Sequence, residues 1–189
     1  MSAQRILDLL SSPTLSLNAK IKALQSRGEK IINLTAGESD FSPPKSLQEA
    51  AIRAIEENLH NHYTPVAGIE TLRQAIADKY NRENAISYLS EQVIVSTGAK
   101  QVLYNALMAL INPGDEVIIH TPTWSTYVEQ IKLAGGVAVE THLQPPFRLK
   151  ADQLAQNLTT KTKAIILNYP ANPTGISLDK AELIKIAEL

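Results

Sequence analysis

Short apolar runs alternate with segments of helical periodicity through the second half of this chain, and no other feature restricts its fold as strongly. The apolar runs lie at 93–95, 116–120, 137–139 and 163–167. Between them, apolar residues recur at the three- and four-residue spacing of amphipathic helices. Strands that alternate with helices build a mostly parallel sheet covered on both faces. The sequence therefore predicts an α/β fold, a three-layer sandwich around a mostly parallel sheet.

The residues before the first of these runs are predicted to be mainly helical. Helical stripes occur at 6–10 and 17–24, and the run 31–34 is expected to form a short strand. Ser42 is a candidate N-cap and Pro43 a candidate first residue of the next helix. A further helix is expected between that one and the first apolar run.

The last helix is expected to be capped by Ser177 and to continue to Leu189. The chain stops there without a Gly or Pro stop signal. We therefore expect a truncated chain, and a natural terminus that frays is the alternative.

Composition excludes several classes of function. A chain of 189 residues can form one sizeable core or most of one large domain, and its net charge of −1 argues against a polyanion-binding surface. No Cys is present, which excludes disulfides, thiolate metal sites and a cysteine nucleophile. No apolar run is long enough to span a membrane, and the N-terminus does not resemble a signal peptide. The sequence predicts a soluble, cytoplasmic protein.

Three loops follow predicted strands, at 96–101, 120–127 and 168–175. Carboxyl ends of parallel strands share one rim, where open α/β sheets bind ligands, so the three loops are expected to converge. The loop 168–175 reads Asn-Tyr-Pro-Ala-Asn-Pro-Thr-Gly, and its prolines and glycine fix an unusual backbone path. A plain polar turn is the alternative interpretation.

The other two loops offer a phosphate site and an aromatic platform. The segment 96–101 opens a helix, whose first amides suit a phosphate, and Gly98 lets a ligand approach the backbone. An ordinary capped helix start is the alternative, and Lys100 is expected to be solvated. Trp124 could stack on a flat ring or could be a core residue. Tyr63, in a Pro- and Gly-containing loop, could reach a phosphate or could be a surface tyrosine. The four histidines, His60, His62, His120 and His142, are interpreted as structural or solvated, with no metal site.

Six segments together resemble the class I and II aminotransferases, which are fold-type I pyridoxal-phosphate enzymes. They lie, in the family's order, at 35–41, 62–68, 96–101, 112–117, 121–124 and 168–175. The match is closest to the prokaryotic aspartate aminotransferases. The resemblance implies a small-domain arm at 1–35, the first portion of the cofactor-binding large domain at 36–189, and a homodimer.

The resemblance also implies a role for individual residues. Gly37 would meet the substrate carboxylate, and Asn172 would bond to the O3′ atom of the cofactor ring. Trp124 would stack on the pyridine ring, and Tyr63 would reach the phosphate bound to the neighbouring subunit. The phosphate itself would be held by the helix start at Gly98, Ala99 and Lys100. Thr14 matches only loosely a position that contacts the substrate side chain in some relatives.

Two departures from the family pattern stand out. The segment Tyr169-Pro170-Ala171 replaces the more usual Ser-Pro-Asn, at positions without a direct cofactor role. More important, the family's Schiff-base lysine, pyridine-nitrogen acid and carboxylate-binding arginine have no match before Leu189, and Asp40, Asp115, Lys161 and Lys163 are not suitably placed to replace them. We thus expect no catalytic residue in this chain.

The expected function is transfer of an amino group from an amino acid, such as aspartate, to a 2-oxo acid. The chain alone is expected to be inactive because the lysine would lie beyond Leu189. A non-catalytic module that binds a phosphate ligand or a partner is one alternative. Another reaction of fold-type I enzymes, such as β-elimination by a C–S lyase, cyclopropane formation or decarboxylation, is a second. Neither nucleic acid nor membrane is expected as a partner.

Overall fold

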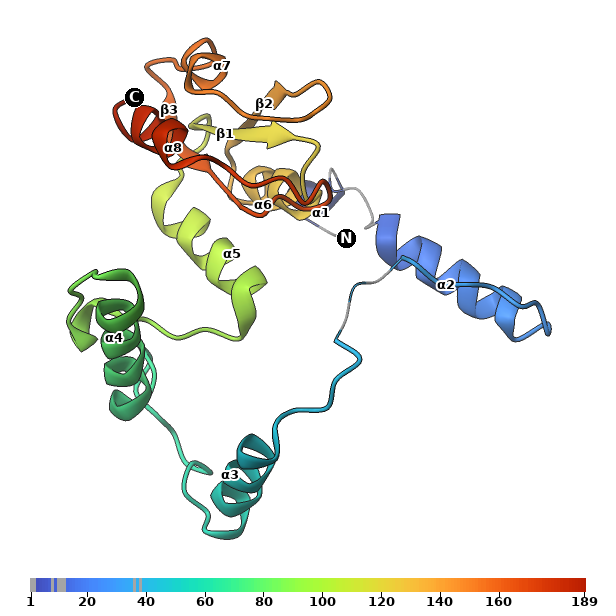
Figure 1. Cartoon of the computed structure of the whole chain (residues 1–189), viewed down its shortest axis with the longest axis vertical. Helices are drawn as coiled ribbons and strands as arrows, with labels where there is room; N and C mark the ends of the chain where they lie inside the picture. Colours follow the sequence, from blue (N-terminus) through green and yellow to red (C-terminus); the bar gives the residue numbers. More distant parts are fainter. Residues whose placement is uncertain (1–2, 8, 10–12, 36, 38) are drawn as a thin grey trace. The chain divides into compact units, whose positions relative to one another are not determined.

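The computed structural model describes all residues except 1–2, 8, 10–12, 36 and 38. Within the described residues, helices are the main elements and three strands form one sheet (Figure 1). The elements are α1 (Gln4–Leu7), α2 (Pro13–Gln25), α3 (Lys45–Glu56), α4 (Glu70–Asn84), the 3₁₀ turn η1 (Ser90–Gln92), α5 (Gly98–Leu110), β1 (Glu116–Thr121), α6 (Thr126–Leu133), β2 (Val137–His142), α7 (Ala151–Ala155), β3 (Thr162–Ile166) and α8 (Lys180–Ala187).

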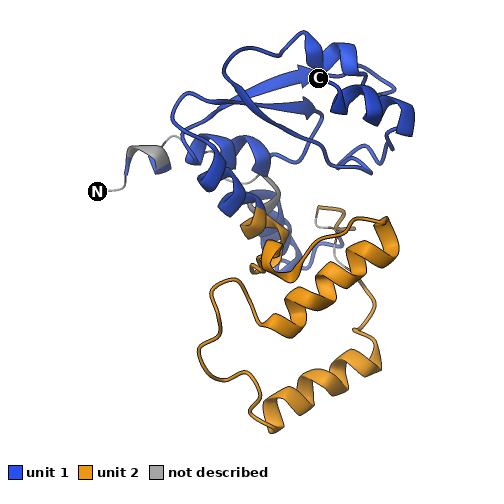
Figure 2. Cartoon of the chain, turned by 90° about the vertical axis from the view of Figure 1, so that its left-hand side faces the viewer, with its two compact units in different colours: residues 1–31, 103–189 blue, residues 32–102 orange. Residues whose placement is uncertain are grey.

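The chain forms two compact units. Unit 1 comprises residues 1–31 and 103–189, and unit 2 comprises residues 32–102 (Figure 2). These units follow from contacts between residues. The division into an arm at 1–35 and a large domain from residue 36 stays a prediction.

The sheet lies in unit 1 and has the strand order β2-β1-β3, with β1 parallel to both neighbours. Ile118 of β1 pairs with Val139 of β2 and with Ile165 of β3. Parallel neighbours require long crossovers, and α6 and α7 lie in the two crossovers seen here. The predicted parallel α/β arrangement is therefore confirmed for the strands at 116–120, 137–139 and 163–167.

Both faces of β1 are buried, as its apolar run predicts. Val117 and Ile119 belong to a core cluster with Leu107, Ile111, Tyr127 and Ile131, which come from α5, its C-terminal end and α6. Ile118 points to the opposite face and joins a second cluster with Leu143, Leu149, Ala151, Leu154 and Ile186, which involves α7 and α8. Because side chains alternate along a strand, the three-layer arrangement follows directly from the sequence of β1.

Two predicted strands are absent. Residues 31–34 and 93–95 have no strand structure, and Ile32 and Leu34 are 88% and 89% exposed. Val95 donates its N–H to the carbonyl of Ala67 at 2.9 Å instead of joining a ladder. A strand needs a neighbouring strand to satisfy its backbone groups, and neither run has one among the described residues.

The predicted caps were displaced by two residues. Helix α3 begins at Lys45 with Pro44 at the N-cap, so Ser42 and Pro43 lie in the preceding loop. Helix α8 begins after Asp179 rather than after Ser177. At neither of these N-caps does a side chain hydrogen-bond to the helix, so neither Ser42 nor Ser177 acts as a capping residue.

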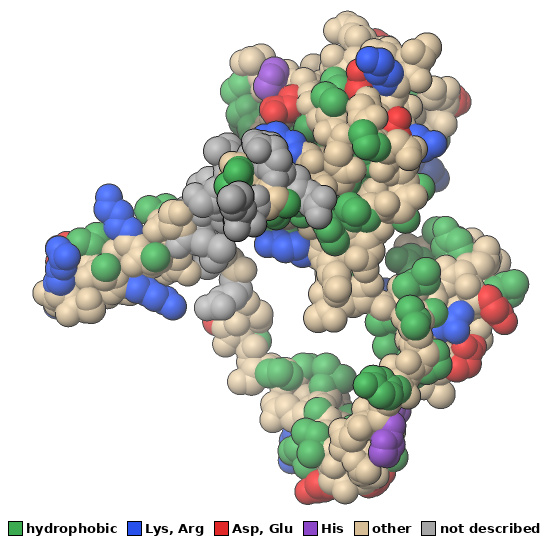
Figure 3. All heavy atoms as spheres, turned by 180° about the vertical axis from the view of Figure 1, so that it is seen from behind, with side chains coloured by type: hydrophobic (Ala, Val, Ile, Leu, Met, Phe, Trp, Pro, Cys, Tyr) green, Lys and Arg blue, Asp and Glu red, His purple; other side chains and the backbone are tan. Residues whose placement is uncertain are grey.

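Unit 2 has little core of its own. Ala77 of α4 is its only buried apolar residue among those described, and α3 has no buried residue. Figure 3 shows apolar side chains at the surface in the part of the view where α3 lies. No helix within the described ranges is both long and apolar enough to span a membrane.

Candidate functional site

The loops after β1 and β3 leave the sheet at the same edge. The two strands are parallel neighbours, so their carboxyl ends meet there. The first loop carries Trp124 and the second carries Asn172. The third loop of the prediction, 96–101, does not follow a strand and belongs to unit 2. The expected convergence of three loops at one rim is thus seen for two of them.

Trp124 is partly buried and packs against the core cluster on the α6 face of the sheet. Its ring meets the ring of Tyr127 edge to face, with centroids 5.4 Å apart and an interplanar angle of 87°. Edge-to-face contact uses the positive edge of one ring against the face of the other. The core role and the platform role considered for Trp124 are therefore compatible, because the indole is anchored while remaining partly accessible.

The loop that carries Asn172 is closed by its own backbone. Ala171 donates its N–H to the carbonyl of Ile176 at 2.8 Å and accepts the N–H of Gly175 at 2.7 Å. Gly175 has φ +70°, a value that favours glycine. Ala171 is buried beneath the loop, whereas Asn172 is exposed. The closure therefore holds an amide side chain outward at the sheet edge, which a plain polar turn would not require.

The start of this loop is held from two directions. The side chains of Asn168 and Tyr127 are hydrogen-bonded to each other. The next residue, Tyr169, stacks on His120 of β1, with centroids 5.3 Å apart and an interplanar angle of 30°. Tyr169 packs against the core cluster on the α7 and α8 face, whereas Tyr127 belongs to the cluster on the α6 face.

Burial shifts the proton affinity of these side chains. It raises the pKa of the Tyr127 hydroxyl, an effect opposed by the hydrogen bond with Asn168, and it raises the pKa of Tyr169. Burial lowers the pKa of His120, while a hydrogen bond to the backbone of Pro122 acts in the opposite direction. Both tyrosines therefore stay protonated, and the lowered pKa favours the neutral ring of His120.

Sequence reasoning assigned no site role to His120, Asn168 or Tyr169. Asn168 entered only as the first residue of the loop 168–175, and Tyr169 only as a departure from the family pattern. A signal was present, because side chains of consecutive residues in an extended segment point to opposite faces. Two polar or aromatic residues directly after a buried strand can therefore contact both cores at once.

The predicted phosphate cradle lies at the start of α5. Gly98 has φ +79°, and nothing lies within 4 Å of the position that a Cβ would occupy, so a ligand can approach the backbone there. Gln101 accepts the N–H of Thr97 through its side-chain oxygen at 2.9 Å, and Gly98 donates to the carbonyl of Ser96. The backbone N–H groups of a first helical turn point out of the helix end, where a phosphate can accept them. Lys100 is exposed, as expected.

Tyr63 and Gly37 are exposed residues of unit 2. Tyr63 lines a surface hollow of about 460 Å³ together with His60, Asn61 and His62. Gly37 is exposed in the loop before α3, and nothing lies within 4 Å of its Cβ position. The side chain of Thr14 lies outside the described part of the chain.

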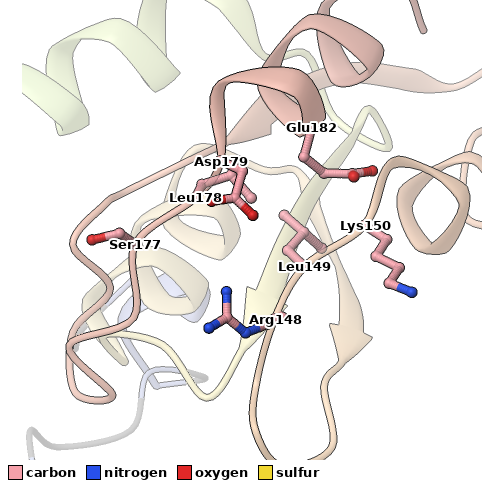
Figure 4. A pocket seen from close by; sticks show the side chains of 7 residues that line it. All are labelled: Arg148, Leu149, Lys150, Ser177, Leu178, Asp179 and Glu182. Atoms are coloured by element: carbon pink, nitrogen blue, oxygen red, sulfur yellow. The ribbon is translucent and has the colours of Figure 1, made fainter.

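A smaller pocket in unit 1 is unrelated to the predicted residues. Its volume is about 80 Å³, and neither Trp124 nor Asn172 lines it. Figure 4 shows Glu182 and the segment that leads into α8 on one side and the segment that leads into α7 on the other. Among the described residues no cluster of His, Asp and Glu is arranged to hold a metal ion.

Comparison with known proteins gives a consistent result. The profile of the family described as aminotransferase class I and II matches residues 29–189. The chain is 45% identical over 188 residues to a probable aspartate/prephenate aminotransferase of Aquifex aeolicus, covering 98% of this chain and 48% of that protein. It is 43% identical over 189 residues to an aspartate aminotransferase of Bacillus subtilis, covering 99% and 48%.

The structural comparison agrees with the sequence comparison. The structure of an aspartate aminotransferase from Thermus thermophilus with maleate matches with a TM-score of 0.95 and 39% identity, covering 100% of this chain and 50% of that one. This chain thus spans about half the length of the relatives that it matches.

Proposed function

This chain belongs to the class I and II aminotransferase family, and we propose that it contributes the first half of the cofactor site of an aminotransferase that uses pyridoxal phosphate. The proposed reaction moves an amino group from an amino acid to a 2-oxo acid. Aspartate is the proposed donor, because all three relatives described above are named for it. A homodimer in the cytoplasm is proposed for the whole protein.

The observation that carries this proposal is the edge of the sheet in unit 1. There the anchored indole of Trp124 and the outward amide of Asn172 lie on the loops that follow two neighbouring parallel strands. An aromatic face and an amide suit a flat ring that bears a polar oxygen. A protein that bound only phosphate would need neither of them.

The residues present fit pyridoxal phosphate in kind. Open space beside Gly98 and the first amides of α5 suit the phosphate group, since a helix N-terminus carries partial positive charge. Trp124 would cover the ring, and Asn172 would donate its amide N–H to the ring O3′ atom. Ala99 and Lys100 would contribute chiefly their backbone amides. When bound, the cofactor supplies an aldehyde that accepts the amino group and a ring that takes up electrons.

Gly37 and Tyr63 complete the proposal as contacts made by exposed loops. Gly37 has no side chain, so its backbone can meet the carboxylate of a substrate. Tyr63 projects its phenol fully into solvent and is 109% exposed. A tyrosine so exposed suits a contact with another subunit, and we propose that it reaches the phosphate bound there.

We propose that the chemistry is divided between this chain and the part of the family's length that this chain does not span. This chain orients the ring and holds the phosphate, and no residue in it is proposed to form the covalent bond to the cofactor. We propose that the 189-residue chain alone does not transaminate.

The test is to titrate the chain with pyridoxal phosphate and to follow the fluorescence of Trp124, its only tryptophan. In Asn172→Ala, loss of the quenching or an affinity weakened about tenfold or more would support the site, since a hydrogen bond to a charged group contributes about 1.5–3 kcal/mol. A matched control is Asn81→Ala, which removes an exposed amide of α4 that belongs to no proposed site. Quenching that is identical in Asn172→Ala would contradict the assignment.

Activity is tested separately. Borohydride reduction followed by peptide mass spectrometry would show whether any lysine of this chain holds the cofactor covalently. For the 189-residue chain, the proposed outcome is no specific labelling and no amino transfer from aspartate to 2-oxoglutarate. In the product of the whole gene, one lysine should be labelled and amino transfer should occur. Turnover by the 189-residue chain, with one labelled lysine, would overturn the division of chemistry proposed here.

A further inference from the structure

Two aromatic rings join the loops that carry Trp124 and Asn172. His120 is the fifth residue of β1, is 4% exposed, and lies four positions before Trp124. Tyr169 lies three residues before Asn172. The two rings are stacked, with their centroids 5.3 Å apart and their planes 30° apart. A contact between the rings therefore links the two loops just before each presents its site residue.

Each of these rings has one buried polar atom without a partner in the described part of the chain, although the imidazole of His120 also makes a hydrogen bond to the backbone of Pro122. The Nδ1 atom of His120 and the hydroxyl of Tyr169 are buried and have no hydrogen-bond partner among the described residues. Two apolar rings would pack in the same place without leaving buried polar atoms unpaired. The unpaired atoms therefore add no stability, and what the two side chains contribute to each other is the stacked contact of their rings.

The opposite face of the sheet repeats the connection. Asn168 hydrogen-bonds with Tyr127, and the ring of Tyr127 meets Trp124 edge to face. Two successive residues, Asn168 and Tyr169, thus fasten the start of one loop to α6 on one side and to β1 on the other. On the β1 side of this arrangement, Tyr169 places a large ring at the position where the family pattern usually has serine.

We propose that His120 and Tyr169 are positioning residues, whose stacked rings set the loop that bears Asn172 against the loop that bears Trp124. This inference rests on the proposed function, because its consequence is the alignment of Asn172 with the cofactor ring. Neither residue is proposed to touch the cofactor. Loss of the stack should act through Asn172 and leave no effect once that amide is absent.

The experiment is a double-mutant cycle in the protein as its gene encodes it. The affinity for pyridoxal phosphate and the wavelength of the bound cofactor's visible absorption band are measured for wild type, Tyr169→Ser, Asn172→Ala and the double variant. Aromatic pairs contribute enough that Tyr169→Ser should weaken binding about 2- to 12-fold. In the Asn172→Ala background the same change should weaken binding less than about 1.5-fold, because the coupled residues do not act additively.

Conservative variants separate positioning from bulk stability. Tyr169→Phe keeps the ring and removes only the unpaired hydroxyl, so affinity and band position should match wild type. His120→Leu fills the space without a ring and should weaken binding as Tyr169→Ser does. Both variants should shift the absorption band in the same direction as Asn172→Ala does. His120→Leu also carries the test if Tyr169→Ser fails to fold. Tyr88→Ser is the matched control, since it removes the aromatic partner of Tyr80 in unit 2.

The outcomes distinguish the inference from the function on which it rests. A full effect of Tyr169→Ser in both backgrounds, or no effect in either while Asn172→Ala weakens binding, would overturn the positioning role alone. No effect of Asn172→Ala on affinity or band position would overturn both the positioning role and the proposed contact of Asn172. An effect of Tyr169→Ser that disappears with Asn172 would support the inference.

Discussion

The carboxylate of Glu182, in the first turn of α8, accepts a hydrogen bond from the backbone N–H of Ala151 at 2.8 Å. Ala151 is the first residue of α7, so its amide has no partner within its own helix. One carboxylate therefore satisfies the start of α7 while lying near the positive end of α8. This bond, and not the predicted Ser177 cap, ties the last helix to α7.

Glu182→Ala should destabilise the contact between α7 and α8, and a lower urea midpoint would show it. The Ala151 hydrogen bond is the main cause that lowers the pKa of Glu182. A lowered pKa gives stability that is present above the ordinary carboxyl pKa and is lost as the pH falls through the folded-state value. The difference between wild type and Glu182→Ala should therefore shrink in acid. Glu188→Ala, at the other end of α8, is the control, and an equal loss in that variant would contradict the assignment.

Gly136 is required by crowding rather than by backbone conformation. A Cβ there would lie 2.8 Å from Ile111 Cγ2 and 3.1 Å from the carbonyl oxygen of Asp115. That carbonyl accepts the N–H of Val137 at 2.8 Å, so it cannot move without breaking the entry into β2. Overpacking of this kind costs about 1–3 kcal/mol. Gly136→Ala should therefore lower the free energy of unfolding by about that amount.

Gly37→Ala is the matched control for this prediction. No atom lies within 4 Å of its Cβ position and its φ is not in the left-handed region. Denaturant unfolding should place this variant within about 0.5 kcal/mol of wild type, as is usual for surface changes. Equal stability of Gly136→Ala and Gly37→Ala would show that the Ile111 contact yields freely.

The burial of His120 predicts a pH-dependent stability. Burial lowers its pKa from the ordinary value of 6.5, so the folded chain holds this ring neutral at a pH where the unfolded chain protonates it. The unfolded state then binds more protons, and stability falls as the pH drops below about 6.5, by at most about 1.4 kcal/mol per pH unit for one proton. His120→Phe should flatten this dependence between pH 7.5 and 5.5 in urea titrations. A dependence that is as steep in His120→Phe as in wild type would contradict this assignment.

The sequence predicted unit 1 well because its signals were local and its partners are within the chain. The runs 116–120 and 163–167 became Glu116–Thr121 and Thr162–Ile166, and the turn before β1 is fixed by Asp115, which accepts the N–H of Asn112 at 2.8 Å. The aromatic contact between Trp124 and Tyr127 was also foreseeable, because the two are three residues apart at a helix start.

Unit 2 was predicted less well for a different physical reason. The apolar runs at 31–34 and 93–95 carry the composition of strands, but a strand forms only against a partner of suitable register. The carbonyl of Val93 instead accepts the side-chain Nε of Arg73 at 2.9 Å. The order of residues after β3 indicates that Tyr169 can reach one core, but its stacking partner His120 was not predictable, because that pairing depends on the register of β1 and β3.

Helix α3 should be the least protected of the long helices in this 189-residue chain. It has 12 residues and no buried side chain. Isolated helices of that length are marginal in water, and most helical stability in proteins comes from packing of an apolar face. The free energy of opening should therefore be close to zero for α3, whereas that for β1, with both faces buried, should approach the global value.

Hydrogen exchange followed by mass spectrometry tests this difference directly. Peptides from 45–56 should exchange within about tenfold of an unstructured chain, and peptides from 116–121 at least about 10³-fold more slowly. Helix α4 provides the comparison within the same unit, because Ala77 is buried and Arg73 is bonded to Val93, so its protection should be intermediate. Protection of α3 equal to that of β1 would mean that its apolar face is covered in solution, and a concentration series would show whether a second copy of the chain covers it.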